Sequence, residues 1–320
     1  MSCSSLSSLV SEVALEAIPS RLFECYGLRL SVLRLDHIHP LVSGNKWFKL
    51  MPALEQAQKR GETLLSFGGA WSNHLHALAY AGYRLGIKTI GIVRGESEYA
   101  ANAMLSDAAG WGMELHFVTR EEYRRRHEVQ YQQSLQSCYG RVRVIPEGGS
   151  NAAAVRSVGA IWGLPALIGG DFDYLVTAVG TGGTLAGLIA GRPAGKHVIG
   201  VPVLKYDQRL VGDIESLLES VGFCDAGGWS LLPGGHQGGY ARLTPELART
   251  LLEVERRFEL PLDPVYTGKA FMAMIRRVMQ GGIPAGSHVI LLHTGGLQGR
   301  RGMASRLAAL APDFVGPLAL

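Results

Sequence analysis

The sequence predicts an α/β fold with two three-layer α/β/α domains and mostly parallel sheets. Short apolar, β-branched runs alternate with helical patterns along almost the whole chain. Strands that alternate with helices pair in parallel and are covered on both faces. Eight such runs in 320 residues indicate two sheets, and therefore two domains. Glycines also gather where these runs end, which is where open α/β sheets bind their ligands.

The strand and helix patterns follow one another in a regular order. The predicted strands are rich in apolar and β-branched residues, as buried parallel strands are, and lie at 30–35, 63–67, 89–93, 114–118, 142–146, 174–179, 198–203 and 288–294. Helical spacing of apolar residues falls between them, for example at 47–60, 73–85, 100–110, 244–257 and 267–279. No internal repeat and no low-complexity linker interrupts this order.

Composition and charge narrow the possible partners. With 47% hydrophobic and 18% charged residues, the chain is predicted to be a well-buried soluble protein. The net charge of +4 comes from scattered basic residues, which does not support nucleic-acid binding but suits a small anionic ligand. The ten histidines form no metal pattern, and the four cysteines are far apart, which favours a reducing compartment. Residues 1–16 lack a basic secretory start and no unbroken uncharged run reaches membrane-spanning length, so we expect a cytoplasmic protein with no membrane or metal partner.

The glycine-rich loop "VGTGGTLAG" at 179–187 lies between a strong strand and a small-residue helical stretch. Glycines let backbone N–H groups approach a phosphate, and the start of a helix adds a favourable dipole. A dinucleotide fingerprint fails because Leu185 stands at the third glycine position, and the Gly-Lys-Ser/Thr of a Walker loop is absent. A single phosphate monoester and a purely structural turn remain as alternatives.

Several polar residues flank the other glycine loops, and each has a structural alternative. In "SGNKWFKL" a helix would place Lys46 and Lys49 on one face, either as snorkelling surface lysines or beside something anionic or covalent. Ser72 and Asn73, in "GGAWSNH", either cap a helix or cradle an anion. The remaining candidates are two tyrosines that either pack or face a site, and a threonine that either caps a strand or faces the crevice: Tyr240, Tyr266 and Thr294.

Seven stretches occur in one order between residues 43 and 296, namely "SGNKWFKL", "GGAWSNH", "PEGGSN", "VGTGGT", "GGYARLTPEL", "LDPVYTGKA" and "HTGG". In this order they resemble the pyridoxal-5′-phosphate (PLP) enzymes of the tryptophan-synthase-β type. Within that type they are similar to the group of 1-aminocyclopropane-1-carboxylate (ACC) deaminases and D-cysteine desulfhydrases. The resemblance implies a tryptophan synthase β-like PLP fold, with a large domain of residues 1–48 and 154–320 and a small domain of residues 49–153. It also implies a homodimer.

The resemblance implies a role for each candidate residue. Lys46 would form the Schiff base with PLP, and a neighbouring cation lowers the pKa of a lysine, which favours such use. Lys49 and the loop residues Gly180, Thr181, Gly182, Gly183 and Thr184 would hold the phosphate. Asn73 would meet the pyridine O3′, Ser72 the substrate carboxylate or the reacting carbon, and Tyr240 and Tyr266 the substrate. Thr294 would bind the cofactor near its pyridine nitrogen, beside Thr267.

The group facing the pyridine nitrogen decides between the members of this group. ACC deaminases read "VYEGK" and "HLGG", whereas this chain has Thr267 and Thr294 at the positions of that glutamate and leucine. A threonine cannot hold the nitrogen protonated, which favours α,β-elimination from a small D-amino acid, with D-cysteine first, over opening a cyclopropane ring. ACC deamination and non-catalytic PLP binding remain alternatives, and Trp71 is a departure from the group that could reshape the substrate pocket.

Overall fold

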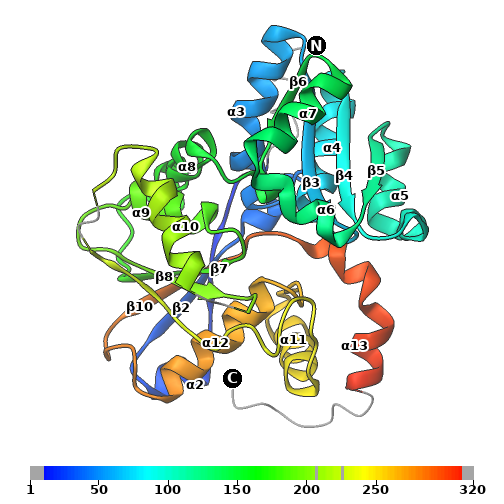
Figure 1. Ribbon diagram of the computed structural model, residues 1–320. Helices are drawn as coiled ribbons and strands as arrows, with labels where there is room; N and C mark the ends of the chain where they lie inside the picture. Colours follow the sequence, from blue (N-terminus) through cyan, green and yellow to red (C-terminus); the bar gives the residue numbers. More distant parts are fainter. Residues whose placement is uncertain (1–10, 206–207, 225–226, 312–320) are drawn as a thin grey trace.

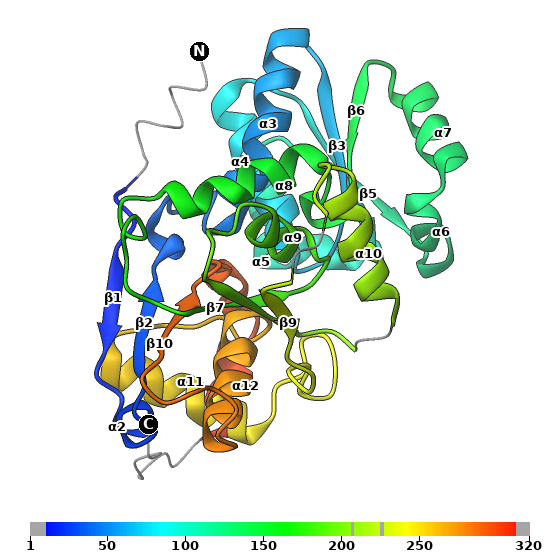
Figure 2. The same cartoon turned by 90° about the vertical axis from the view of Figure 1, so that its left-hand side faces the viewer.

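The computed structural model describes residues 11–205, 208–224 and 227–311, which form two sheets flanked by helices (Figures 1 and 2). The larger sheet has six strands in the order β1-β2-β10-β7-β8-β9. Its strands are β1 Leu15–Ile18, β2 Arg29–Leu33, β7 Tyr174–Val179, β8 His197–Pro202, β9 Trp229–Leu231 and β10 His288–Leu292. Only β1 runs antiparallel to its neighbour; the other pairs are parallel.

The smaller sheet is wholly parallel and has four strands in the order β5-β4-β3-β6. Its strands are β3 Thr63–Gly69, β4 Thr89–Arg94, β5 Glu114–Val118 and β6 Val142–Ile145. All four come from one continuous stretch of chain, the cyan and green upper part of Figure 1. The larger sheet instead combines strands from before and after this stretch.

Helices cover both faces of each sheet, so each sheet lies in the middle of three layers. One face of the larger sheet packs on α11 (Pro245–Phe258) and α12 (Thr267–Met279), the other on α8 (Ala152–Gly159), α9 (Gly183–Ala190) and α10 (Gln208–Glu219). The smaller sheet packs on α3 (Asn45–Arg60), α4 (Asn73–Leu85) and α5 (Ala103–Gly110) on one face and on α6 (Arg120–Arg124) and α7 (Val129–Tyr139) on the other. The helices α2 (Arg21–Cys25) and α13 (Ala304–Leu310) belong to the same hydrophobic cluster as α11 and α12, where α2 contacts β2 and α13 contacts α11. The predicted fold class is confirmed.

All eight predicted strands are present, with ends shifted by a few residues, and two further strands were not predicted. These are β1 and β9, which form the two edges of the larger sheet. Both are short and partly exposed, so they lack the apolar run that identifies a buried strand. The helix predicted from residue 100 begins at Ala103, because the Asn102 side chain accepts from the N–H groups of Met104 and Leu105 and caps it there.

The domain boundaries remain a prediction, and α3 runs through the one proposed at residue 48. None of the helices in the described part of the chain combines the length and apolar character needed to cross a bilayer. Within the same residues, no group of three or more histidine, cysteine or acidic side chains is arranged to hold a metal ion. The described cysteines, Cys25, Cys138 and Cys224, are exposed and form no disulfide.

Candidate active site

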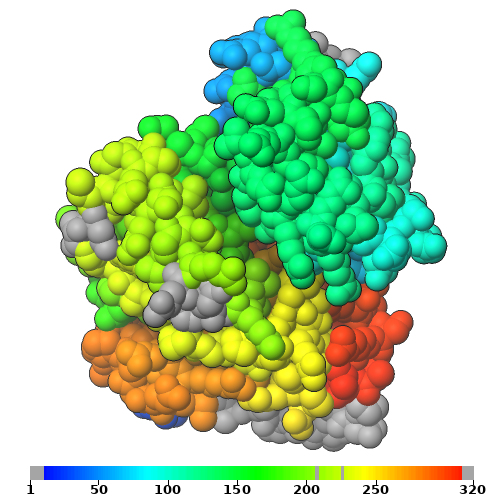
Figure 3. Space-filling model, viewed as in Figure 1, coloured from blue at the N-terminus to red at the C-terminus, as the bar shows by residue number. Residues whose placement is uncertain are grey.

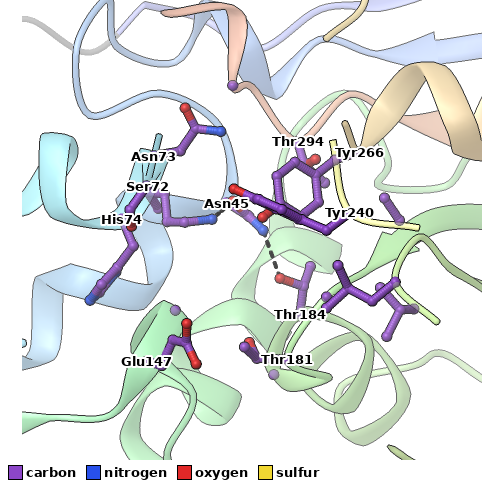
Figure 4. Close-up of a pocket in the computed structure, with 18 of the residues that line it drawn as sticks. Asn45, Ser72, Asn73, His74, Glu147, Thr181, Thr184, Tyr240, Tyr266 and Thr294 are labelled. Atoms are coloured by element: carbon purple, nitrogen blue, oxygen red, sulfur yellow. Dashed lines mark hydrogen bonds between the residues drawn. The ribbon is translucent and has the colours of Figure 1, made fainter. Parts of the chain in front are cut away.

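A pocket of about 670 Å³ lies between the two sheets, at the carboxyl ends of their parallel strands. It opens at the hollow near the centre of Figure 3, where the four-stranded part meets the segments around α10 and α11. All twelve candidate residues from the sequence line it: Lys46, Lys49, Ser72, Asn73, Gly180, Thr181, Gly182, Gly183, Thr184, Tyr240, Tyr266 and Thr294. Figure 4 shows how seven of these side chains converge from both sheets. The structure thus gathers them in one place, while the role of each remains a prediction.

The start of α3 is fixed by a close approach of two backbones. Gly44 has a φ of +65°, and a Cβ at this position would lie 2.0 Å from the carbonyl oxygen of Thr294. Only glycine permits both features. The N–H of Asn45 also donates to this oxygen, at 3.4 Å. Because α3 begins here, Lys46 and Lys49 both line the pocket from one face of its first turn.

The two lysines have different surroundings. Nζ of Lys46 donates to Oδ1 of Asn45 at 2.9 Å, and burial lowers the pKa of Lys46 to about 8. Nζ of Lys49 donates to the carbonyl of Gly148 at 2.8 Å and to Oγ of Ser150 at 3.0 Å. Burial, followed by the charge of Lys46, lowers the pKa of Lys49 well below its usual value. The expectation that a neighbouring cation lowers the pKa of a lysine holds for Lys49, where burial is the larger cause. For Lys46 burial alone lowers the pKa, and the charge of Asp263 opposes it.

The loop before α9 forms a narrow cradle beside Lys49. A Cβ at Gly183 would lie 2.4 Å from Oγ of Ser150 and 3.0 Å from Nζ of Lys49, so the loop backbone comes very close to both groups. The hydroxyl oxygens of Ser150 and Thr181 are 2.7 Å apart. Nδ2 of Asn45 donates to Oγ1 of Thr184 at 2.7 Å, which joins this loop to the start of α3. An ammonium group, two hydroxyls and a helix N-terminus in one place suit an anion.

The start of α4 forms the wall on the side of the smaller sheet. Oγ of Ser72 accepts from the N–H of Leu75 at 3.2 Å, so the capping interpretation of Ser72 is confirmed. Oδ1 of Asn73 is buried and has no hydrogen-bond partner among the described residues. A buried polar atom without a partner is costly and marks a position where a ligand can supply one.

His74 carries a second unpaired atom on this wall. The hydroxyl of Ser66 donates to the carbonyl of Ile145 at 2.9 Å, so the Ser66–His74 contact of 2.8 Å needs the proton on Nε2 of His74. Nδ1 of His74 then holds a lone pair, and it has no partner within the described residues. Burial, together with the charges of Lys46 and Lys49, lowers the pKa of His74 well below its usual value, which keeps the ring neutral. Asn73 and His74, two consecutive residues that line the pocket, therefore each carry a buried acceptor atom with no partner among the described residues.

The two tyrosines, Tyr240 and Tyr266, lie side by side in the pocket (Figure 4). Tyr266 stands at the start of α12, where Asp263 caps the helix by accepting from the N–H groups of Val265, Tyr266 and Thr267 at 2.7 to 3.0 Å. Tyr240 lies on a loop and is 43% exposed, into the open pocket. Desolvation raises the pKa of both phenols, so both hydroxyls keep their protons at neutral pH.

The two threonines that the resemblance sets near the pyridine nitrogen, Thr267 and Thr294, lie together. Their hydroxyl oxygens are 3.4 Å apart, with Thr294 in the pocket lining and Thr267 fully buried behind it. The buried carboxylate of Asp263 is also in this region, but it accepts three backbone N–H groups. Trp71 does not line the main pocket; it lines a small adjoining one beside Asn73, Tyr240 and Tyr266.

Sequence reasoning missed several residues of the site. Asn45 and Ser150 were quoted inside motifs but given no role, although both hold groups of the predicted cradle in place. Asp263 precedes the predicted helix 267–279 by four residues and stands inside the turn sequence "PLDP", which is a recognisable capping position. Arg94 and Glu147 stand at the ends of predicted strands, so their position was a usable signal.

This fold, with a buried lysine and an anion cradle at the strand ends, defines the class of enzymes that use pyridoxal phosphate. The sequence profile of that family, described as "Pyridoxal-phosphate dependent enzyme", matches residues 18–295. The chain belongs to this family and depends on pyridoxal phosphate.

Its relatives point to one group within the family. A putative 1-aminocyclopropane-1-carboxylate deaminase of Thermotoga maritima is 35% identical over 306 residues, covering 90% of this chain and 95% of the relative. A bifunctional D-cysteine desulfhydrase/1-aminocyclopropane-1-carboxylate deaminase of Arabidopsis thaliana, described as mitochondrial, is 27% identical and covers 90% and 77%. A solved structure of an ACC deaminase homologue superimposes with a TM-score of 0.82 at 24% identity, over 94% of both chains. The protein is therefore an ACC-deaminase-like, PLP-dependent enzyme.

Proposed function

We propose that this enzyme catalyses α,β-elimination from a small D-amino acid, with D-cysteine the first candidate, giving pyruvate, sulfide and ammonia. The observation that carries the proposal is the pair Thr267 and Thr294. Their hydroxyls are 3.4 Å apart at the pocket, and the neighbouring carboxylate of Asp263 is taken up by backbone N–H groups. The position expected to face the pyridine nitrogen therefore offers a neutral hydroxyl. A neutral partner gives a weaker electron sink, which suits loss of a good leaving group better than ring opening.

The residues fit the cofactor. Lys46 would hold it covalently through Nζ, and Lys49 with the loop from Gly180 to Thr184 would bind its phosphate. The amide of Asn73, whose Oδ1 is unpaired among the described residues, would hydrogen-bond its phenolic group. The space beside Gly183, which even a methyl group would fill, matches a loop built to meet a phosphate at close range. Pyridoxal phosphate, when bound, supplies an electron sink for the electron pair left at Cα.

The side chains of the site supply the proton transfers. Nζ of Lys46, with its pKa lowered to about 8, can take the Cα proton near neutral pH. The hydroxyls of Tyr240 and Tyr266 stay protonated and can donate to the departing group. The substrate carboxylate would lie at the start of α4, against Ser72 and the helix N-terminus.

ACC deamination is the second candidate, because the names of the relatives favour it. A non-catalytic PLP-binding protein is disfavoured, since holding the cofactor needs neither tyrosine. We also propose a homodimer in the cytoplasm, as the resemblance and the composition suggest.

Turnover of D-cysteine, L-cysteine and ACC by the PLP-loaded protein, assayed side by side, tests the proposal. We expect sulfide and pyruvate from D-cysteine only, and none from Lys46→Ala. 2-Oxobutanoate from ACC, at a kcat/KM equal to or above that for D-cysteine, would mean that the two threonines do not set the chemistry. Inactivity on all three amino acids, with PLP still bound, would contradict D-cysteine as substrate.

A further inference from the structure

The pocket carries more positive charge than its cofactor and a simple amino acid require. Against one carboxylate, that of Glu147, six cationic side chains are found in the lining among the described residues: Lys46, Lys49, Arg94, Arg126, Lys205 and Arg242. Glu147 is already paired, because Oε2 accepts from Nε of Arg126 at 2.8 Å and Oε1 accepts from the Tyr123 hydroxyl at 2.7 Å. Arg126 is thereby paired, whereas Arg94, Lys205 and Arg242 make no ion pair within the described residues.

Arg94 is an exposed cation whose guanidinium lies over an aromatic ring at the edge of the pocket. It ends β4 and lies in register with Gly69, the last residue of β3, just before the turn that leads to Ser72. Its Cζ lies 5.5 Å from the centre of the Tyr123 ring, and Nη2 would be 3.6 Å from a Cβ at Gly69. Within the described residues it makes no hydrogen bond and no ion pair. The guanidinium is therefore held in place by a ring, with its five N–H donors still available.

The expected ligand charges do not account for Arg94. The phosphate of the cofactor belongs to Lys49 and the cradle at Gly183, and the substrate α-carboxylate to the start of α4. Both sites are built from other residues. Lys205 and Arg242, also without partners among the described residues, add to the same field from segments of the six-stranded part. A ligand that carries one further negative charge would pair with these cations.

We propose that the preferred substrate carries an anionic group on Cβ, such as a phosphate or another oxyanion, and that Arg94 binds this group. This inference rests on the proposed elimination and names its substrate class. The guanidinium fork matches the oxygens of such a group in a bidentate manner, which a neutral substituent cannot offer. Arg94 is then a specificity-determining residue of the small-sheet wall.

The reaction balances without an oxidant or a reductant. Nζ of Lys46 takes the Cα proton, the bond from Cβ to the substituent breaks, and the substituent leaves with the bonding electron pair. Water then converts the released aminoacrylate into pyruvate and ammonium. For O-phospho-D-serine the bond broken is Cβ–O, and the products are hydrogen phosphate, pyruvate and ammonium.

The test compares a charged and a neutral substrate of similar size, O-phospho-D-serine and O-acetyl-D-serine, in the PLP-loaded wild type and in Arg94→Gln. We expect the wild type to prefer the phosphate compound. The ratio of the two kcat/KM values should fall about 10- to 100-fold in Arg94→Gln, as loss of a charge-assisted pair predicts. Arg84→Gln is the matched control. Arg84 also stands over a tyrosine ring, 5.9 Å from that of Tyr80, but outside the pocket lining, so its substitution should leave the ratio unchanged.

A second measurement reports binding without turnover. D-2-Amino-3-phosphonopropanoate and D-2-aminobutanoate differ in the anionic group and present no comparable leaving group. We expect calorimetry to show tighter binding of the phosphonate to the loaded wild type, weakened by salt and by Arg94→Gln.

Three outcomes are distinguishable. A ratio that Arg94→Gln leaves unchanged, or equal losses on both substrates, overturns the inference, because Arg94 would then be structural or would bind the α-carboxylate. A wild type that prefers the acetyl compound overturns the inference while the proposed elimination stands. Inactivity on both substrates and on D-cysteine, with PLP bound, contradicts the proposed function, and the inference falls with it.

Discussion

The two walls of the pocket differ in how the polar groups beside their helix starts are paired, although the larger-sheet wall also carries Lys205 and Arg242, which have no partner among the described residues. On the wall of the larger sheet, Asp263 accepts three N–H groups, and Lys269 donates to the carbonyls of His236 and Gly239 at 3.0 and 2.7 Å. On the wall of the smaller sheet, Oδ1 of Asn73, Nδ1 of His74 and the guanidinium of Arg94 have no hydrogen-bond partner among the described residues. The paired wall fixes geometry within the protein. The unpaired groups of the smaller-sheet wall can bind ligands. We therefore expect substitutions there to change ligand affinity more than the stability of the cofactor-free protein.

The largest expected effect is that of substituting Lys46, which lies between the two walls. Lys46→Ala removes the amine that would hold the cofactor and take the Cα proton, so we expect kcat to fall at least about 10³-fold. Stopped assays of pyruvate formation measure this loss. Lys59→Ala, an exposed lysine at the end of the same helix, is the control and should keep full activity. Residual turnover within about tenfold of the wild type would show that another residue is the base.

The next effect concerns the paired wall. The side chain of Lys269 is fully buried, and its ammonium ties the loop that carries Tyr240 to α12. Lys269→Met keeps the length but leaves two carbonyls unpaired, so we expect kcat to fall about 10- to 100-fold as Tyr240 loses its position.

Hydrogen exchange in residues 236–240 separates this effect from a general loss of stability. We expect faster exchange in that loop and unchanged exchange in β3 and β4 of Lys269→Met. Uniformly faster exchange would assign Lys269 a role in global stability rather than in positioning Tyr240.

At the start of α4, the paired side chain of Ser72 and the unpaired Oδ1 of Asn73 are adjacent, so their substitutions can be compared directly. Ser72→Ala removes the helix cap and should lower the free energy of unfolding of the cofactor-free protein by about 1 kcal/mol. Asn73→Ala removes a buried acceptor without a described partner and should lower that stability less, but it should weaken pyridoxal phosphate binding about 10-fold. Thermal unfolding and cofactor titration of both variants measure the contrast. Equal affinity for the cofactor in Asn73→Ala and the wild type would remove Asn73 from the cofactor site.

The sequence was sufficient for the parts of the molecule that are locally encoded. Buried parallel strands are continuous apolar runs, and the loops at their ends are marked by glycines, so the interior strands and the region of the pocket could be predicted. The edge strands β1 and β9 could not, because their pairing comes from the neighbouring strand and not from their own residues. Contacts between distant residues were equally hidden. The pairs Asn45–Thr184 and Tyr123–Glu147 join separate helical elements, and no local pattern specifies them.

The smallest expected effect is on the pH dependence of cofactor binding, and it tests whether burial between the two walls of the pocket sets the reactivity of Lys46. Burial lowers the pKa of Lys46 to about 8, so its amine is half neutral near pH 8 and not near the usual value of about 10.5. Only the neutral amine can attack the cofactor, so the rate at which stripped protein recovers the yellow absorbance of bound pyridoxal phosphate should rise with pH below 8. The rise between pH 7 and 8 should be about 5-fold, because the neutral fraction grows from about one eleventh to one half. Above pH 9 the rate should level off, since the amine is then almost wholly neutral. A rate that continues to rise to pH 10 would mean that Lys46 behaves as an exposed lysine and that burial does not set its pKa.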